Sequence, residues 1–421
     1  MELNRSTLSC IVVSIIALHL ISKLVQGRRE EEILQKRDCS RPRHYSHKDP
    51  VWGIGLFVGI VESISNGNNF AFFQSLFDKY GKAFEVNSWG QKAIYTIDAE
   101  NIHTILVKSQ KKFIVEPSSL HATECFLGRG IFNTDGSSWK QAHLASKPIF
   151  ARAQIPILDI LEEHMDTLLA MIPHDGTTVD LLPRLKRLFL DTSTALIFGD
   201  SINILKSEKG QIDTEKFLAA FDTVLQGIGL RVALGKFASA KPRQVLEEGS
   251  KAEKTEKTEK TSISTNSPSP NRRLVLLDEL LKTAQDHIYL CSHIFFNLAR
   301  NPEVWNRLQN EISNYDGPLI YDSLKQMRYA NAIVDESLRI LAPSGRSIRS
   351  CGEDRILRTG GGPNGKDLIL VIRGTEVNYI FRSMHLDKDI WGAEADEYRP
   401  ERWESLGKAQ LRAYIPFSEG D

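Results

Sequence analysis

The strongest constraint on the fold is a pair of opposite charges inside an apolar run. Glu336 and Arg339 lie three residues apart, so a helix places them on one face, where they can pair. On a solvent-exposed helix such a pair would contribute only about a few tenths of a kcal/mol. The residues around the pair are apolar, however: Ile333, Val334, Leu338, Ile340 and Leu341. They indicate a buried helix, in which a charge must be paired.

A second arginine is expected to complete a three-membered cluster with this pair. Arg402 follows in the segment Tyr398–Trp403, which reads as a loop. The chain then ends with Ile-Pro-Phe-Ser-Glu-Gly-Asp, in which Phe417 and Gly420 form a Phe-x-x-Gly pattern. The order and spacing of these three segments resemble the cytochrome P450 family of haem-thiolate monooxygenases.

The resemblance implies a haem b cofactor and assigns several residues to its site. In that family two arginines clamp one glutamate beside the haem, and the motif Phe-x-x-Gly-x-Arg-x-Cys supplies the thiolate that holds the iron. It follows that Glu336, Arg339 and Arg402 are expected to form a structural haem-pocket cluster, and Phe417 and Gly420 to bind the cofactor. The axial cysteine is expected beyond the last residue, so the fold is predicted to be incomplete at the C-terminus, with no metal ligand in this chain.

Two further segments match positions that contact the haem propionates in the family. The family usually has Trp-x-x-x-Arg, whereas this chain has Trp139 and His143. A guanidinium gives a carboxylate two parallel hydrogen bonds, while a protonated histidine gives one. Arg346 matches the position that contacts the other propionate. The alternative for Trp139 is a plain core residue.

Three local patterns resemble the fungal branch of the family that hydroxylates alkanes and fatty acids. They are Phe189–Gly199 (FLDTSTALIFG), Gly360–Gly365 (GGGPNG) before an apolar strand, and Ser383-Met384-His385 ahead of Lys388-Asp389.

Composition excludes some classes of function. The 421 residues suggest one large multilobed domain or two domains. Lysine and arginine together number 53 and aspartate and glutamate also number 53, so no basic excess supports nucleic-acid binding. The five cysteines are scattered, without a Cys-x-x-Cys pair, which argues against a zinc site or a disulfide framework and fits a protein facing the cytosol.

The N-terminal residues 1–25 are predicted to form a single-pass membrane anchor. Residues 8–22 carry no lysine, arginine or acidic residue, and the apolar span reaches Val25 if Lys23 extends toward the interface, which is close to the minimum for crossing a bilayer. Arg28 and Arg29 follow, so the body is expected on the cytoplasmic side of the endoplasmic reticulum membrane. A cleaved signal peptide or a buried helix is the alternative. Residues 26–50 are polar and predict a linker.

The remaining residues, 51–421, are expected to form one mainly α domain with small β-sheets, in a cytochrome P450-like fold. A helix is predicted over Phe70–Tyr80 and strands around Ala83–Val86 and Ala93–Ile97. Helical patterns follow from Ala99 to Leu234 and from Leu274 to Leu341, and strands after Pro343, with a turn at Gly360–Pro363. In the first helical region, one helix face is expected to carry Leu181, Leu185 and Leu188.

Residues 249–271 interrupt this order. They contain three Glu-Lys-Thr repeats and a serine- and proline-rich tail, with almost no apolar residue to bury, and so predict a low-complexity solvated loop. A charged docking site is the alternative.

The chain departs from the family where oxygen is activated. The family has a small-Gly-x-acid-Thr-Thr run in the helix that delivers protons, but here Asp286 is an acid without a preceding glycine or a following Thr-Thr. The preferred explanation is a missing block of about five helical turns between Asp286 and His287. The alternative is a degenerate proton relay formed by these two residues. No other catalytic residue is assigned.

None of the five cysteines matches the axial ligand. Cys351 comes closest, but it lacks the preceding Phe-x-x-Gly and lies in a strand-like run. It therefore reads as an ordinary small residue.

The resemblance implies a membrane-bound monooxygenase that hydroxylates a long-chain apolar substrate, an alkane or a fatty acid. Oxygen would be the oxidant, and electrons would come from NADPH through cytochrome P450 reductase. Whether this chain is an enzyme depends on the missing ligand. The alternative is a truncated or mis-spliced, catalytically dead remnant that acts at most as a membrane-tethered binding protein. A third hypothesis, an adaptor, rests on the Glu-Lys-Thr loop alone.

Overall fold

The computed structural model divides into two compact units. Unit 1 comprises residues Met1–Phe113 and Ser350–Asn378, and unit 2 comprises Ile114–Arg349 and Tyr379–Asp421. The structure describes residues 25, 27–49, 53–88, 90–152, 157–206, 219, 223, 227–228, 231, 288–342 and 345–417. The predicted anchor, apart from residue 25, and the predicted low-complexity loop both lie outside these residues.

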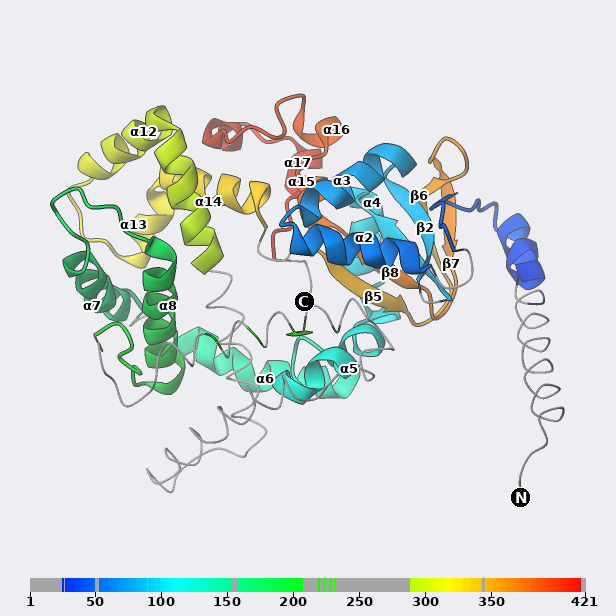
Figure 1. The fold of residues 1–421 in the computed structure, drawn as a ribbon, viewed down its shortest axis with the longest axis horizontal. Coiled ribbons are helices and arrows are strands. Elements are labelled where there is room, and N and C mark those ends of the chain that lie inside the picture. Colours follow the sequence, from blue (N-terminus) through cyan, green and yellow to red (C-terminus); the bar gives the residue numbers. More distant parts are fainter. Residues whose placement is uncertain are drawn as a thin grey trace, which may run out of the picture. The chain divides into compact units, whose positions relative to one another are not determined.

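Unit 1 is built on two small β-sheets (Figure 1). One sheet has the strand order β1-β2-β3-β8-β5-β4 and the other pairs β6 with β7. The strands are β1 (Arg43–His44), β2 (Ala83–Ser88), β3 (Gln91–Thr96), β4 (Phe113–Ile114), β5 (Ser347–Cys351), β6 (Arg355–Gly361), β7 (Asp367–Val371) and β8 (Glu376–Tyr379). The chain passes from one unit to the other within or beside β4, β5 and β8.

Aromatic side chains form the core of unit 1. β2 and β3 pair antiparallel with Phe84 opposite Tyr95, and the two rings stack with centroids 5.4 Å apart. Phe73 of α3 also stacks on Tyr95, with ring centroids 5.9 Å apart. The helical segments of this unit are α2 (Ile54–Ser65), α3 (Asn69–Tyr80), α4 (Ala99–His103), η1 (Thr104–Lys108) and η2 (Gln110–Lys112). The predicted helix 70–80 and the two predicted strands are therefore found, within about two residues at their ends.

The glycine run forms the predicted turn between β6 and β7. The amide of Gly360 donates to the carbonyl of Gly365 at 2.9 Å. Gly360 has φ +104°, and a Cβ placed there would lie 2.5 Å from the Cβ of Ala83. A larger residue would therefore face both backbone strain and a clash with β2.

Part of the predicted linker is folded onto unit 1. Residues 27–36 are mostly helical, and β1 pairs parallel with β2. Leu34 and Cys39 are buried in one cluster with Leu370 of β7. Lys92 of β3 forms ion pairs with Glu30 and, at 3.2 Å, with Glu85. This segment is therefore ordered by contacts with residues that are distant in the sequence. Its own polar composition did not predict this.

Unit 2 is mainly helical. Its helices are α5 (Glu116–Leu127), α6 (Gly136–Arg152), α7 (Ile157–Ala170), α8 (Leu181–Phe198), α12 (Pro302–Ser313), α13 (Tyr321–Gln326), α14 (Arg328–Ile340), α15 (Phe381–His385), α16 (Lys388–Trp391), η4 (Pro400–Glu404) and α17 (Lys408–Ala413). Residues 288–300 are also helical. Together the two units agree with the prediction of a mainly α protein with small sheets.

Helices α7 and α8 pack through the predicted apolar face. Leu185 and Leu188 are buried against Leu168 of α7 and Leu205, and Leu181 packs on the same cluster. Helix α8 begins where the Asp180 side chain accepts the amide of Leu182 at 3.1 Å. The 3.6-residue periodicity of this run thus gave both the helix and its buried side.

Helix α14 is held at its N-terminus by α12. The Glu311 carboxylate of α12 accepts the amides of Tyr329 and Ala330, each at 2.8 Å, and so satisfies two N–H groups of the first turn of α14. Tyr329 and Ile333 are buried with Leu298 and Val304 in one cluster. Helix α14 therefore has a fixed start and one buried apolar side.

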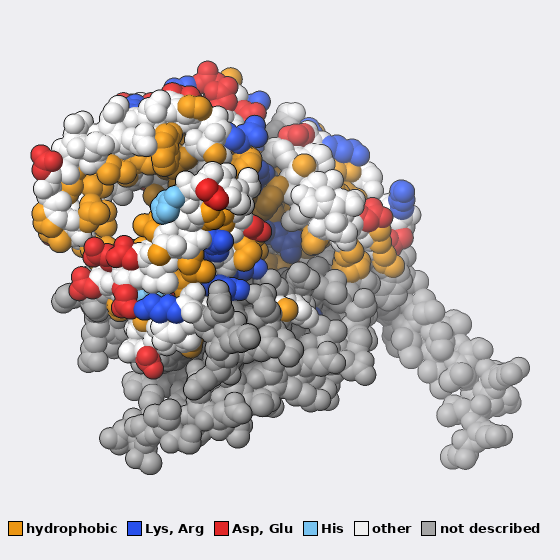
Figure 2. Space-filling view, turned by 60° about the vertical axis from the view of Figure 1, so that its left-hand side comes forward, with side chains coloured by type: hydrophobic (Ala, Val, Ile, Leu, Met, Phe, Trp, Pro, Cys, Tyr) orange, Lys and Arg blue, Asp and Glu red, His pale blue; other side chains and the backbone are white. Residues whose placement is uncertain are grey.

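Two observations concern the surface. Among the described residues, no helix combines the length and the hydropathy needed to cross a bilayer. On the described part of the face in Figure 2, lysine and arginine side chains are interspersed with aspartate and glutamate. This face thus reflects the balance of charges in the sequence.

Candidate functional site

The candidate site is centred on one buried carboxylate near the C-terminal end of α14. Glu336 accepts five hydrogen bonds. Its Oε1 accepts from Arg339 Nη2 at 2.9 Å, Arg402 Nε at 3.0 Å and the amide of Arg399 at 2.9 Å. Its Oε2 accepts from Arg339 Nε at 2.9 Å and from the Trp403 indole at 3.0 Å. The structure therefore brings Glu336, Arg339 and Arg402 together.

Arg339 is fully buried, and each of its N–H groups has an acceptor. Beyond its two bonds to Glu336, Nη1 donates to the carbonyls of His385 at 2.7 Å and Ala395 at 2.6 Å, and Nη2 donates to the carbonyl of Glu397 at 3.2 Å. A guanidinium has five N–H donors, so the five bonds use its full capacity. The guanidinium also lies 5.0 Å from the centre of the Trp391 ring.

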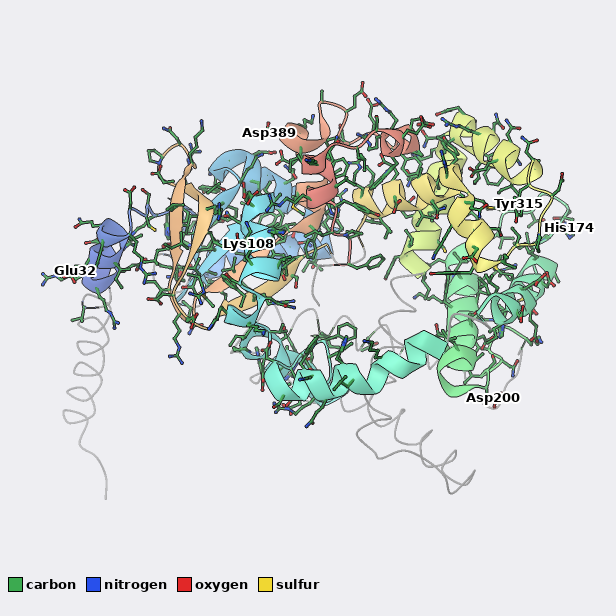
Figure 3. All side chains as sticks on the ribbon, turned by 180° about the vertical axis from the view of Figure 1, so that it is seen from behind. Glu32, Lys108, His174, Asp200, Tyr315 and Asp389 are labelled. Atoms are coloured by element: carbon green, nitrogen blue, oxygen red, sulfur yellow. The ribbon has the colours of Figure 1, made fainter. Side chains whose placement is uncertain are left out.

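Arg402 connects the same carboxylate to the preceding loop. Its Nη2 donates to the carbonyls of Glu394 at 2.9 Å and Glu397 at 3.3 Å. This loop follows α16, which the label of Asp389 marks in Figure 3. The cluster thus fastens residues 394–403 to α14.

The electrostatics keep Glu336 ionised. Burial by itself raises the pKa of this carboxyl, but the hydrogen bonds and charge of Arg339, the amide of Arg399 and the charge of Arg402 outweigh it, so the pKa is lowered. Glu336 and Arg339 are both 0% exposed. Water is excluded, and the protein itself supplies all of the donors that stabilise the charge.

His385 is a neutral, buried neighbour of the cluster. Burial and the charge of Arg339 lower its pKa to about 3. Its Nε2 accepts the amide of Ile415 at 3.2 Å, so the proton of the neutral ring is assigned to Nδ1. His385 therefore links the carbonyl that holds Arg339 to the chain that follows α17.

Trp139 and His143, which were predicted to bind the cofactor, both lie on α6 and contact each other. Trp139 and His143 are one helical turn apart and half-buried, and their rings stack with centroids 4.9 Å apart and an interplanar angle of 19°. The start of α6 is joined to α5, because the Asp135 carboxylate accepts the amides of Val115 at 2.8 Å and Glu116 at 2.7 Å.

The remaining predicted residues are more dispersed. Arg346 is half-buried directly before β5. Phe417 is described and 56% exposed. Asp286 and Gly420 lie outside the described residues.

The described cysteines do not fit a thiolate ligand. Cys351 is buried; desolvation, reinforced by Asp354, raises its pKa to about 12, and its Sγ donates to the carbonyl of Glu353 at 2.9 Å. Burial also raises the pKa values of Cys291 and Cys39. Within the described part of the chain, no three His, Cys, Asp or Glu side chains are arranged to hold a metal ion. Cys351 is thus an ordinary buried thiol.

The sequence did not reveal some partners of the cluster. Trp403 stands directly after Arg402, so its indole was a visible candidate donor in the motif. The Arg399 amide and the carbonyls of His385, Ala395 and Glu397 carry no side-chain signal, since backbone groups of any residue type can take these places.

The chain thus has a mainly helical unit that contains a buried Glu–Arg–Arg cluster, and a second, smaller unit with two sheets. A family profile for cytochrome P450 matches residues 47–256 and 290–421, and the chain belongs to the cytochrome P450 family. The family prediction is therefore confirmed. The profile match is interrupted over residues 257–289.

Similar proteins come from several fungi. The cytochrome P450 monooxygenase iccC of Talaromyces variabilis is 29% identical over 442 residues, covering 95% of this chain and 85% of the relative. The cytochrome P450 monooxygenase apdE of Emericella nidulans is 30% identical over 414 residues, covering 91% and 78%. The cytochrome P450 monooxygenase himC of Aspergillus japonicus is 27% identical over 441 residues, covering 96% and 78%. These names give a class of activity and no substrate.

Membership of this family implies haem, a reductase partner and a small-molecule substrate. By residue type, three of the predicted residues suit the carboxylates of a haem. The Trp139 indole, the His143 imidazole and the Arg346 guanidinium offer N–H groups, which suit the two carboxylates of the cofactor. The described thiols do not suit its iron, because burial raises the pKa values of Cys39, Cys291 and Cys351.

Proposed function

We propose that this protein is a membrane-bound, haem-dependent monooxygenase that hydroxylates a long-chain apolar substrate, an alkane or a fatty acid, with O2 and electrons from NADPH delivered by a reductase. The observation that carries the proposal is the Glu336 cluster, a buried carboxylate held by five donors in a chain of this family. The names of the relatives support the reaction class. The substrate class rests on the sequence patterns at 189–199, 360–365 and 383–389.

Bound haem would supply the chemistry of oxygen activation and C–H hydroxylation. The protein's own residues would hold and orient it. Trp139, His143 and Arg346 would bind the carboxylates of the cofactor, with Arg346 as the permanently charged member of the set. The Glu336 cluster would keep residues 394–403 fixed on α14 without contacting the reacting atoms.

The proposed location is the endoplasmic reticulum membrane, with residues 1–25 as a single-pass anchor and the body in the cytoplasm. The apolar run at 8–22 and the following Lys23, Arg28 and Arg29 support it. Protease treatment of intact microsomes is the test: the body should be digested without detergent. Protection of the body until detergent is added would reverse the orientation.

The function is tested with the full-length protein co-expressed with a fungal reductase. The reduced carbon-monoxide spectrum should show the displaced Soret band of a thiolate-ligated haem. Microsomes should then consume NADPH and form hydroxylated product from one of a panel of n-alkanes and fatty acids, and omission of the reductase should abolish product. A displaced band without turnover of any panel member would refute the substrate class and leave the monooxygenase class in place.

The second candidate is a non-catalytic, membrane-tethered binding protein. The interruption of the family match over residues 257–289, where the oxygen-activating segment is expected, favours it. Absence of any haem spectrum, together with saturable binding of an alkane or fatty acid by the purified protein, would select this candidate over the monooxygenase.

A further inference from the structure

Side chains from three other elements contact Tyr414 and Ile415, which shortly precede the Phe417-x-x-Gly420 pattern. The Tyr414 hydroxyl donates to Asp335 Oδ1 of α14 at 2.8 Å. The Ile415 amide donates to His385 Nε2 of α15 at 3.2 Å. The Trp403 ring of η4 meets the Tyr414 ring edge to face, with centroids 4.5 Å apart. Ala413 and Ile415 are themselves buried.

Each of these three holding residues is also joined to the Glu336 cluster. Asp335 precedes Glu336 on α14, and the backbone carbonyl of His385 accepts a hydrogen bond from Arg339 at 2.7 Å. The Trp403 indole donates to Glu336 at 3.0 Å. Hydrogen bonds, one ring contact and the chain link between Asp335 and Glu336 therefore connect the cluster to Tyr414 and Ile415.

The chemistry of the contacts favours a fixed geometry. Burial and the nearby Asp335 raise the pKa of Tyr414, so its hydroxyl keeps its proton and acts as a donor. His385 is neutral, and only its unprotonated Nε2 can accept the Ile415 amide. The Tyr414 phenol thus donates to the Asp335 carboxylate, and the His385 imidazole accepts from the Ile415 amide. Each contact pairs one donor with one acceptor.

We propose that Asp335, His385 and Trp403 are positioning residues that set where the chain leaves α17 toward the cofactor-binding pattern, with Tyr414 as the group they hold. The inference rests on the proposed function, because that pattern is expected to bind haem. Displacement of residues 413–415 would move Phe417 relative to the Glu336 cluster. The contact between Asp335 and Tyr414 is the part that can be removed without changing the volume of the core.

The experiment compares Tyr414→Phe with Asp335→Asn in the full chain. Phenylalanine removes the donor, whereas asparagine keeps an oxygen that can accept from Tyr414, so Asp335→Asn is the conservative control. Far-UV circular dichroism first establishes that both variants fold. Hydrogen–deuterium exchange at residues 413–417 should be about tenfold faster in Tyr414→Phe and near wild type in Asp335→Asn. Exchange in α8 and α12 should not change.

A second measurement follows haem. In the haem-loaded full-length protein, transfer of haem to apomyoglobin should be about fivefold to tenfold faster in Tyr414→Phe, with a shifted or broadened Soret band, and near wild type in Asp335→Asn. Unchanged exchange at 413–417 would overturn the inference, and so would faster exchange spread evenly over unit 2, which indicates a general structural role. Normal haem retention in Tyr414→Phe would also overturn it. A wild-type protein that takes up no haem would instead overturn the proposed function, while the exchange comparison would still decide whether the contact holds residues 413–415.

Discussion

Replacement of Glu336 by glutamine tests the central cluster most directly. The substitution keeps the size of the side chain but removes the charge that five donors share. The fully buried Arg339 and the almost fully buried Arg402 would stay charged without a counter-charge. In addition, the N–H groups of the new amide would face N–H groups that already donate to this position. Loss of one partner from a buried ion pair costs about 3–5 kcal/mol. We therefore expect Glu336→Gln to lower the free energy of unfolding by about that amount.

A matched control exists on the surface of the same unit. Glu404 pairs with Arg307 at 2.6 Å, a shorter distance than the ion pairs of Glu336 at 2.9 and 3.0 Å, but the two side chains are 61% and 49% exposed. Exposed pairs contribute about 0–1 kcal/mol, because water already solvates both charges. Glu404→Gln should therefore cost at most about 1 kcal/mol, although distance alone would rank it as the stronger pair.

Equilibrium unfolding in urea, followed by far-UV circular dichroism, compares the two variants with the wild type at neutral pH. Hydrogen exchange at residues 394–399 adds a local measurement, since these residues depend on the cluster. Since the pKa of Glu336 is lowered in the folded protein, its contribution is complete above the unfolded value of about 4.3. It disappears as the pH falls through the folded-state pKa, so the deficit of Glu336→Gln should shrink in acid.

Equal losses for the two variants would contradict this reasoning. A deficit of Glu336→Gln that stayed constant to low pH would contradict the assignment of an ionised carboxylate. A stable Glu336→Gln with unchanged exchange at 394–399 would show that the cluster does not hold that loop.

Three further substitutions test other parts of the structure. His385→Gln should remove a pH dependence of stability, because the buried ring has a pKa of about 3, against about 6.5 in the unfolded chain. Between these two values, the free energy of unfolding of the wild type should fall by about 1.4 kcal/mol for each unit that the pH is lowered. Urea unfolding at several pH values should find a smaller slope in the variant. Asp135→Ala removes the carboxylate that accepts two amides at the start of α5 and should cost about 1–2 kcal/mol, with faster exchange of those amides; unchanged exchange would reject the cap. Leu188→Ala should lower the free energy of unfolding by about 2–5 kcal/mol, because the Leu188 side chain is buried where α7 and α8 pack together. Leu182 is exposed, so Leu182→Ala should cost about 0.5 kcal/mol or less. Similar urea midpoints for the two variants would refute the packing.

The sequence predicted local structure best where one period repeats over many residues. Leu181, Leu185 and Leu188 recur at helical spacing, and the buried side of α8 follows from that spacing alone. The Glu336–Arg339 pair was predictable for a related reason, because a charge within an apolar helix has few alternatives to a buried partner. Both inferences use residues within about two helical turns of each other.

Contacts between distant residues set the limit of such prediction. Leu34 is buried because Leu370, 336 positions later, covers it, and nothing in the polar run around Leu34 indicates that partner. The hydrogen bond between Asp335 and Tyr414 was missed for the same reason, since a carboxylate beside Glu336 reads equally well as a solvated residue. The stacking of His143 on Trp139 is local, but the sequence pattern had assigned both side chains to a cofactor, with a core position as the alternative for Trp139.

The Glu336 cluster is better explained by the orientation that it gives to residues 394–403 than by a net gain in the stability of the protein. Well-packed apolar residues of the same volume often stabilise a protein as much as a buried ion cluster does, because desolvation offsets much of the attraction between the charges. Apolar contacts are not directional, however, whereas the cluster makes hydrogen bonds to the side chain of Trp403, the amide of Arg399 and carbonyls at 385, 394, 395 and 397. Each bond has a preferred angle and length, so together they allow one arrangement of that loop on α14. Since Glu311 fixes the other end of α14, we infer that this helix is the rigid reference against which the segment at 413–415 is placed.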